Sequence, residues 1–166
     1  MRIRSHVGLA LVTVAAVVFL AGYAAAGAVA PTFVSPAGTT RYAMVARGPL
    51  DGIVTTSSIF VDITGLSVII GIPSGKHAEL IVTFSGEVNT CDAMYVRATV
   101  DGAAAAPAYT QLQWAFGGGA DSHSFTFFKK DVGPGSHTVA MQWRGLSTCD
   151  HQFMDARSMI VTANIH

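Results

Sequence analysis

Apolar and polar residues alternate one by one along most of the chain after residue 41. Successive side chains of a β-strand point to opposite faces, so this alternation is typical of strands with one buried face. Gly, Pro, Asp and Ser separate the alternating runs, as turn residues do. The sequence therefore predicts about eight strands: 42–46, 59–63, 66–72, 79–85, 94–100, 124–127, 138–144 and 159–165.

Each run has one apolar set that we expect to face a core. Gly65 is expected to end the run that begins at Ile59, because glycine weakens a strand interior. The predicted inward residues are Ile59, Val61, Ile63, Leu66, Val68, Ile70, Ile72, Leu80, Val82, Phe84, Met94, Val96, Ala98, Val100, Phe125, Phe127, Val139, Met141, Trp143, Met159, Val161, Ala163 and Ile165.

Helices are not expected beyond the N-terminal segment. Ala103–Ala106 favours helix locally, but Gly102 and Pro107 bound it, so it is predicted to be a loop. Strands without helices to cover their sheet have to form a sandwich or barrel, in which sheets cover one another. The fold class predicted from the alternation is therefore all-β and antiparallel.

The N-terminal segment has the three parts of a secretory signal. Arg2 and Arg4 form a positive start, Val7–Gly22 is an uncharged apolar stretch, and small residues follow it. A-x-A sites predict cleavage after Ala26 or after Ala28. The alternative is an uncleaved membrane anchor, since a spanning helix needs about 20 apolar residues.

These features predict the organisation of the chain and its location. Residues 1–28 are expected to be the signal peptide, 29–40 a short linker and 41–166 the β-domain. The mature protein is then secreted and extracellular. Without Arg2 and Arg4 the mature part contains eight basic and ten acidic residues, which gives a net charge of −2. No basic run is present, which argues against nucleic acid and anionic membranes as partners.

Two cysteines, Cys91 and Cys149, lie in the part expected to be exported. An even cysteine count in an oxidising compartment favours a disulfide. Each cysteine lies beside a predicted strand, so the bond would join two loops. The alternative is a pair of thiols that bind metal, which the lack of a CxxC pair disfavours.

Four segments of the chain resemble a known group of proteins. They are FVDITGLSVIIGIPSGKHAELIVTFSGEV, YVRATVDG, SFTFFKKDVGPGSHTVAMQWR and DARSMIVTANI. They are similar to secreted bacterial β-sandwich proteins, which in turn resemble the jelly-roll domains of the C1q and tumour-necrosis-factor type. The resemblance covers roughly 42–165. It implies a jelly roll of about 8–10 strands, a possible homotrimer, and binding of other molecules rather than catalysis.

Two aromatic residues near a glycine run are candidates for a ligand surface. Trp114 and Phe116 precede three glycines, and exposed aromatic rings on a sandwich can stack on sugars. The alternative is that both rings pack in the core or between subunits. Trp143 shares a face with apolar residues and is expected to be core.

A second candidate surface surrounds the predicted disulfide. Asp92, Asp150 and His151 lie beside the two cysteines, and loop carboxylates suit Ca²⁺. The alternative is that both aspartates are ordinary turn residues. The remaining histidines form no metal-binding pair, and no cofactor is predicted.

Three arginines, Arg97, Arg144 and Arg157, are expected on strands among apolar neighbours. Such arginines usually pair with carboxylates. The candidate partners are Asp62, Glu79, Glu87 and Asp155.

The sequence predicts a secreted, non-enzymatic β-sandwich that binds an extracellular protein or glycan or associates with itself. A carbohydrate-binding domain that uses exposed aromatics is the first alternative. A small extracellular hydrolase is the second, although no nucleophile motif such as G-x-S-x-G is present and no catalytic residue is assigned.

Overall fold

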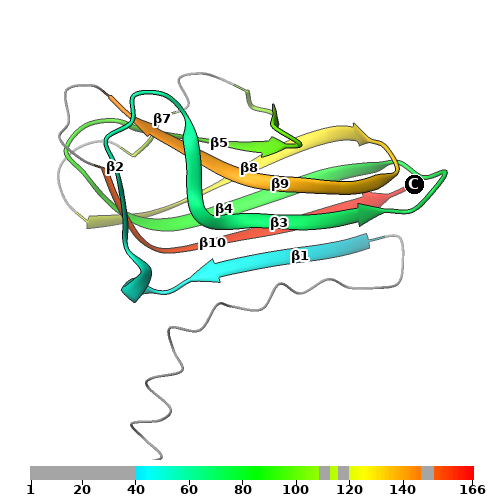
Figure 1. Ribbon diagram of the computed structural model, residues 1–166, viewed down its shortest axis with the longest axis horizontal. Coiled ribbons are helices and arrows are strands. Elements are labelled where there is room, and N and C mark those ends of the chain that lie inside the picture. The colour runs from blue at the N-terminus through cyan, green and yellow to red at the C-terminus, as the bar shows by residue number, and fades with distance from the viewer. Residues whose placement is uncertain (1–39, 109–112, 116–119, 147–151) are drawn as a thin grey trace, which may run out of the picture.

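The protein is a sandwich of two antiparallel β-sheets, shown as a ribbon in Figure 1. This computed structural model describes residues 40–108, 113–115, 120–146 and 152–166, with only the backbone of Gln113–Ala115. The first sheet has the order β1 (Thr40–Arg47), β10 (Gln152–Ile165), β4 (Ala78–Thr90), β8 (Ala120–Val132), and β2 (Ile53–Thr55) also pairs with β10. The second has the order β3 (Val61–Ile72), β9 (Gly135–Gly145), β5 (Met94–Val100), β6 (Ala103–Ala104), and β7 (Gln113–Ala115) also pairs with β5. One 3-10 turn, η2 (Pro49–Asp51), links β1 to β2.

The strand pairs are nested from the two ends of the described chain inward. β1 pairs with β10, β3 with β9, β4 with β8 and β5 with β7. Pairs of this kind, rolled so that successive ones alternate between two sheets, make a jelly roll. The predicted antiparallel jelly-roll sandwich is therefore confirmed, with ten strands in the described residues.

The core lies between the two sheets, and its residues are the ones that alternation predicts. Val82 and Phe84 of β4 are fully buried, and Trp143 of β9 is only 2% exposed. The odd-numbered neighbours of Val82 and Phe84 point away from the core, as the period of two requires. Expected inward residues of β5, β9 and β10 are buried in the same way.

The predicted break between the strands 59–63 and 66–72 is wrong. Gly65 does not end a strand, because β3 continues through it from Val61 to Ile72. The register of β3 on β9 instead shifts between Asp62 and Ser67, and Gly65 has a φ of +76° that glycine adopts without strain. Ile59 lies before the strand and is 72% exposed, so it is not a core residue.

Three short strands were not expected. β2 and β7 have three residues each, and β6 occupies Ala103–Ala104, within a stretch predicted to be a loop. Each pairs with an outer edge of β10 or β5. Two or three residues are too few to show a period, so pairing with a long neighbour defines these strands.

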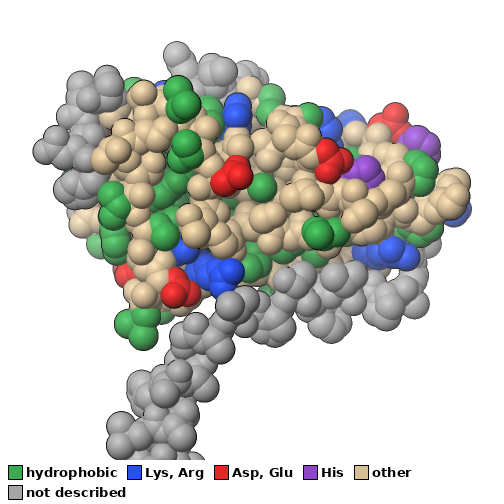
Figure 2. Space-filling view, viewed as in Figure 1, with side chains coloured by type: hydrophobic (Ala, Val, Ile, Leu, Met, Phe, Trp, Pro, Cys, Tyr) green, Lys and Arg blue, Asp and Glu red, His purple; other side chains and the backbone are tan. Residues whose placement is uncertain are grey.

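Histidine–aspartate pairs gather at the end of the sandwich that carries the β3–β4 and β8–β9 turns, where Figure 2 shows purple and red side chains together. His77 Nδ1 lies 2.7 Å from Asp131 Oδ1, and His137 Nδ1 lies 2.7 Å from Asp101 Oδ2. Both aspartates have positive φ, 49° at Asp101 and 55° at Asp131. Asp101 also accepts a hydrogen bond from the Thr138 backbone N–H at 2.8 Å. These side chains therefore hold the tight turns in place.

We expect part of the stability of the fold to be lost below about pH 4, as Asp101 becomes protonated. The hydrogen bond from His137, and then that from the Thr138 N–H, hold the pKa of Asp101 below its usual 3.8. A carboxyl with a depressed pKa stabilises the fold above its unfolded pKa, and this contribution disappears as pH falls through the folded pKa. Because the Asp101 side chain is 51% exposed, the loss should be at most about 1 kcal/mol.

Urea unfolding of Asp101→Asn at a series of pH values tests this expectation. Asparagine tolerates the positive φ and can still accept from Thr138, but it carries no charge. The variant should lose less stability than the unaltered protein between about pH 5 and pH 3. Parallel profiles for the two proteins would contradict the role of Asp101.

No helix within the described ranges is long and apolar enough to cross a membrane. The segment predicted to be a signal peptide or an anchor precedes residue 40 and lies outside those ranges. Its cleavage, and the domain boundaries that depend on it, stay predictions.

Candidate functional site

Most of the ligand-surface residues predicted from the sequence lie where the structure describes no side chains. Trp114 belongs to β7, of which only the backbone is described, and Phe116, Asp150 and His151 lie outside the described residues. Their role in binding stays a prediction. Cys149 also lies outside them, so its pairing with Cys91 stays a prediction, although no cysteine in the described part is a free thiol.

Asp92 is arranged as a turn residue. Its Oδ1 accepts a hydrogen bond from the backbone N–H of Ala93 at 2.7 Å, and its backbone carbonyl accepts one from Thr90 Oγ1. No group of three or more potential metal ligands occurs among the described residues. Asp92 thus makes the contacts of a turn residue. A Ca²⁺ site that it would share with Asp150 and His151 stays a prediction, because those two residues lie outside the described ranges.

The outer face of the second sheet carries two of the three strand arginines. Arg97 Nε donates to Gln142 Oε1 at 2.7 Å, and its guanidinium carbon lies 4.2 Å from the centre of the Phe60 ring. Arg144 lies over the Tyr95 ring at the same distance of 4.2 Å. The predicted pairing of Arg97 with a carboxylate is thus wrong, because a glutamine stands between it and Asp62. Guanidinium groups cover faces of both rings on this side of the sandwich.

The outer face of the first sheet presents rings and aliphatic side chains to solvent. Tyr42 is 44% and Phe128 47% exposed, at opposite edges of one row across β1, β10, β4 and β8. Three strand spacings separate them, about 14 Å. In the next row Met44 lies opposite Ile160, and these two are 40% and 42% exposed. We call these four residues the apolar rows.

Hydroxyl groups on the same face begin in the row of Met44 and Ile160, which continues through Thr83 to Thr126, and fill the next row. Thr83 and Thr126 oppose each other with their Oγ1 atoms 3.4 Å apart, and Ser85 Oγ donates to Ser124 Oγ at 3.0 Å. Ser158 lies opposite Ser85 on the neighbouring strand. The face therefore changes from apolar to hydroxyl-bearing along the direction of the strands.

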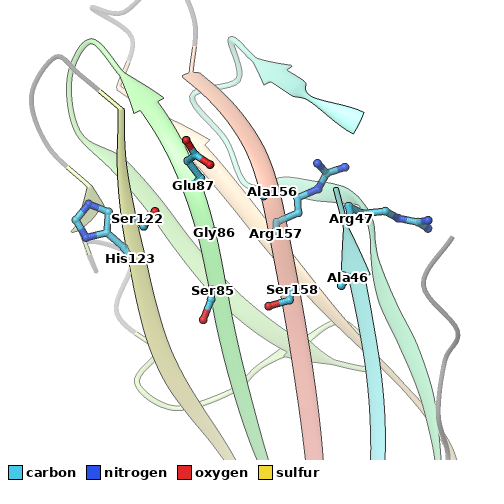
Figure 3. A pocket seen from close by; sticks show the side chains of 10 residues that line it. All are labelled: Ala46, Arg47, Ser85, Gly86, Glu87, Ser122, His123, Ala156, Arg157 and Ser158. Atoms are coloured by element: carbon cyan, nitrogen blue, oxygen red, sulfur yellow. The ribbon is translucent and has the colours of Figure 1, made fainter. Parts of the chain in front are cut away.

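A hollow of about 330 Å³ ends this face, and Figure 3 shows its lining. Gly86 and Ala156 leave room in its floor, and β10 is irregular there, since its register on β4 shifts between Met154 and Arg157. Glu87 and Ser122, which oppose each other on β4 and β8, lie on one side. The full lining is Ala46, Arg47, Ser85, Gly86, Glu87, Ser122, His123, Ala156, Arg157 and Ser158.

A second cavity, of about 350 Å³, lies on the other side of the same two arginines. We call it the notch; its lining is Arg47, Asp51, Gly52, Ile53, Thr64, Gly65 and Arg157. Arg47 and Arg157 oppose each other on β1 and β10. In Figure 3 both side chains extend towards the β1 edge of the sheet, away from Glu87. The notch therefore opens at the edge of the sandwich where β1 leads into η2.

Arg157 is the buried centre of this region and is only 4% exposed. Its Nη1 donates to the carbonyls of Asp51 (2.7 Å) and Asp155 (2.9 Å), and its Nη2 donates to Thr64 O at 3.1 Å. Burial lowers the pKa of its guanidinium; Asp51 opposes that shift and Arg47 adds to it. The predicted carboxylate partner is wrong here too, because main-chain carbonyls accept all three hydrogen bonds.

No protein-family model and no curated protein matches the chain. Solved structures similar to it include the EclA C-terminal domain, a sugar-binding protein (10% identity, TM-score 0.38, covering 76% of this chain and 81% of that one). A family 35 carbohydrate-binding module from Clostridium thermocellum is similar at 12% identity and TM-score 0.34, covering 70% of this chain and 96% of that one. A family two carbohydrate esterase from Cellvibrio japonicus is similar at 10% identity and TM-score 0.29, covering 74% of this chain and 34% of that one. TM-scores this low do not extend the functions of these proteins to this chain, so its function has to be argued from its own residues.

Proposed function

We propose that the chain is a non-enzymatic binding module that holds a glycan on the outer face of its first sheet. The observation that carries the proposal is the pair of exposed rings, Tyr42 and Phe128, on a face that also bears rows of hydroxyl groups. A sugar ring has an apolar C–H face and a rim of hydroxyl groups, so rings next to hydroxyls match it on both counts. The hollow beyond the hydroxyl rows adds charged groups at one end.

The hydrolase alternative finds less support in the geometry. Both ring nitrogens of His137 are used, one by Asp101 and the other by the Gly133 carbonyl at 2.9 Å. His123, which lines the hollow, lies 3.3 Å from Asp121 Oδ2. A catalytic histidine has to lie within hydrogen-bond reach of a nucleophile, and neither ring nitrogen of His137 is left for one.

Replacing either ring by alanine should weaken glycan binding. For Tyr42→Ala and for Phe128→Ala we expect the dissociation constant to rise about tenfold or more, because stacking and burial of an aromatic ring are lost. Affinity electrophoresis against a panel of soluble neutral and acidic polysaccharides, followed by calorimetry on any that bind, measures this. The matched control is Ile69→Ala, which removes an exposed apolar side chain from the opposite sheet.

Self-association is the second candidate, and a specific observation favours it. Met44 and Ile160 are adjacent, exposed and aliphatic, which suits contact with a second copy better than contact with sugar. Sedimentation of the same variants separates the two functions. A monomeric protein that binds no polysaccharide would contradict both functions. An oligomer that Tyr42→Ala and Phe128→Ala dissociate would show that the face binds a second copy of the chain and not a glycan.

A further inference from the structure

Arg157 is a buried cation whose donors are only partly used. A guanidinium has five N–H donors, and three of them reach carbonyls, which leaves the Nε–H and one N–H of Nη2. The Nε atom is buried and has no hydrogen-bond partner. No carboxylate of the described chain lies within ion-pair distance of Arg157. Asp51 and Asp155 attract the guanidinium from beyond that distance, while Arg47 repels it. A buried charge without a counter-charge in direct contact is costly, so this position favours an anion nearby.

Arg47 places a second positive charge beside the first. It opposes Arg157 across β1 and β10, and both residues line the notch. Its Nε donates to Gly65 O at 3.3 Å, and within the described residues nothing accepts from its two terminal nitrogens. Like charges repel each other, so an anion in the notch would stabilise both. Figure 2 shows blue and red side chains side by side where β1 leads into η2.

Gly65 makes room for the Arg47 side chain. A Cβ at this position would lie 2.4 Å from Arg47 Nε, and the φ of +76° also favours glycine. A similar contact joins β1 to β3 at a second place, six residues before Arg47, where Arg41 Nη1 donates to Gly71 O at 2.7 Å. Arg41 does not line the notch. Its Nε is buried without a hydrogen-bond partner, as that of Arg157 is, and it does not line the hollow either. Arg41 is therefore a matched arginine with a similar backbone contact, placed outside both cavities.

We propose that the notch binds the carboxylate of an acidic sugar. The planar fork of a guanidinium matches a carboxylate in two parallel hydrogen bonds, and the terminal nitrogens of Arg47 are placed to make them. Arg157 supplies charge from behind and holds the wall of the notch. Asp51 also lines it, and its carboxylate offers acceptors to sugar hydroxyls. A volume of about 350 Å³ suits one sugar unit. The carboxylate follows from the two arginines, and that it belongs to a sugar rests on the proposed function.

Titrations with three probes test the inference: glucuronate, acetate and glucose, each followed by NMR chemical shifts of the full mature chain. Glucuronate should bind most tightly and shift the Arg47 side-chain Nε–H signal. Arg47→Gln keeps a donor for Gly65 O but loses the charge, and should weaken glucuronate binding about tenfold, which corresponds to about 1.4 kcal/mol. Arg41→Gln, the control, should leave the affinity unchanged. Asp51→Asn should strengthen binding, because it removes a negative charge beside the carboxylate.

Three outcomes would overturn the inference. If glucose and glucuronate bind equally well, or if Arg47→Gln binds glucuronate as tightly as the unaltered protein does, the notch does not recognise the carboxylate. If acetate and glucuronate bind equally well, the notch does not recognise the sugar. Failure of the proposed function is separable, because Tyr42→Ala and Phe128→Ala alter the face and not the notch. If these variants abolish polysaccharide binding while the unaltered protein does not bind glucuronate, only the notch proposal fails. If the variants keep polysaccharide binding while the unaltered protein binds glucuronate, the notch proposal stands and the proposed glycan-binding face fails.

Discussion

Replacing Arg157 by methionine is expected to lower the free energy of unfolding by about 3 kcal/mol. The side chain reaches three backbone carbonyls in three parts of the chain: Asp51 in η2, Thr64 in β3 and Asp155 in the irregular part of β10. Methionine fills a similar volume but donates nothing, so each carbonyl loses its partner at a cost of roughly 1 kcal/mol. Removing a buried cation gives back some desolvation energy, but the orphaned carbonyls outweigh it when the partners stay in place.

Urea unfolding of Arg157→Met, Arg157→Lys and Arg97→Met measures this effect. Lysine keeps the charge but cannot present a planar fork to three carbonyls, so it should rescue little of the loss. Arg97 is the control, because its hydrogen bond goes to a side chain on the outer face of the second sheet. A loss below about 1 kcal/mol for Arg157→Met would show that water replaces the guanidinium without cost.

The core could be predicted from the sequence because its signal is local. On β4 and β9 the period of two alone determines which side chains share a face, whichever strand lies beside them. The buried sets around Phe84 and Trp143 therefore follow from the chain itself. The jelly-roll order does not follow from alternation, since a period says nothing about partners; only the resemblance implied it.

The arginine site depends on register and could not be predicted in the same way. Arg47 and Arg157 lie far apart in the sequence and meet only because β1 pairs with β10 at that register. Gly65 carried a signal that we interpreted as a strand end. A glycine inside a strand can also mark the close approach of another group, which is what the Arg47 side chain makes there. Arg157 was expected to pair with a carboxylate, but backbone carbonyls at an irregular strand need hydrogen-bond donors as much as carboxylates do, and they accept its hydrogen bonds here.

The exposed rings were missed for two different reasons. Phe128 follows Phe127 directly, so an inward Phe127 already implies an outward Phe128, and this signal was present in the sequence. Tyr42 was less accessible to such reasoning. Either Tyr42 or its neighbour Ala43 has to face the core, because adjacent residues of a strand point to opposite faces. The larger apolar residue, Tyr42, is the more obvious core candidate. Pairing of β1 with β10 buries Ala43 and leaves Tyr42 outside.

Phe127→Ala and Phe128→Ala should therefore differ sharply although the residues are neighbours. Phe127 is fully buried and packs on Phe125, with ring centres 5.1 Å apart. Its loss should cost about 3–5 kcal/mol, from lost burial and the cavity that remains. Phe128 is 47% exposed, and its contacts with Ala106 are backbone hydrogen bonds that alanine keeps. We expect Phe128→Ala to cost less than about 1 kcal/mol.

Thermal and urea unfolding of the two variants, together with polysaccharide binding, separates packing from recognition. Phe127→Ala should lose stability and, where it stays folded, keep its affinity, because the outer face is unchanged. Phe128→Ala should keep its stability and lose affinity. Equal destabilisation by the two substitutions would mean that the outer face of the first sheet is covered in the folded protein, and the glycan proposal would then lose the exposed ring on which it depends.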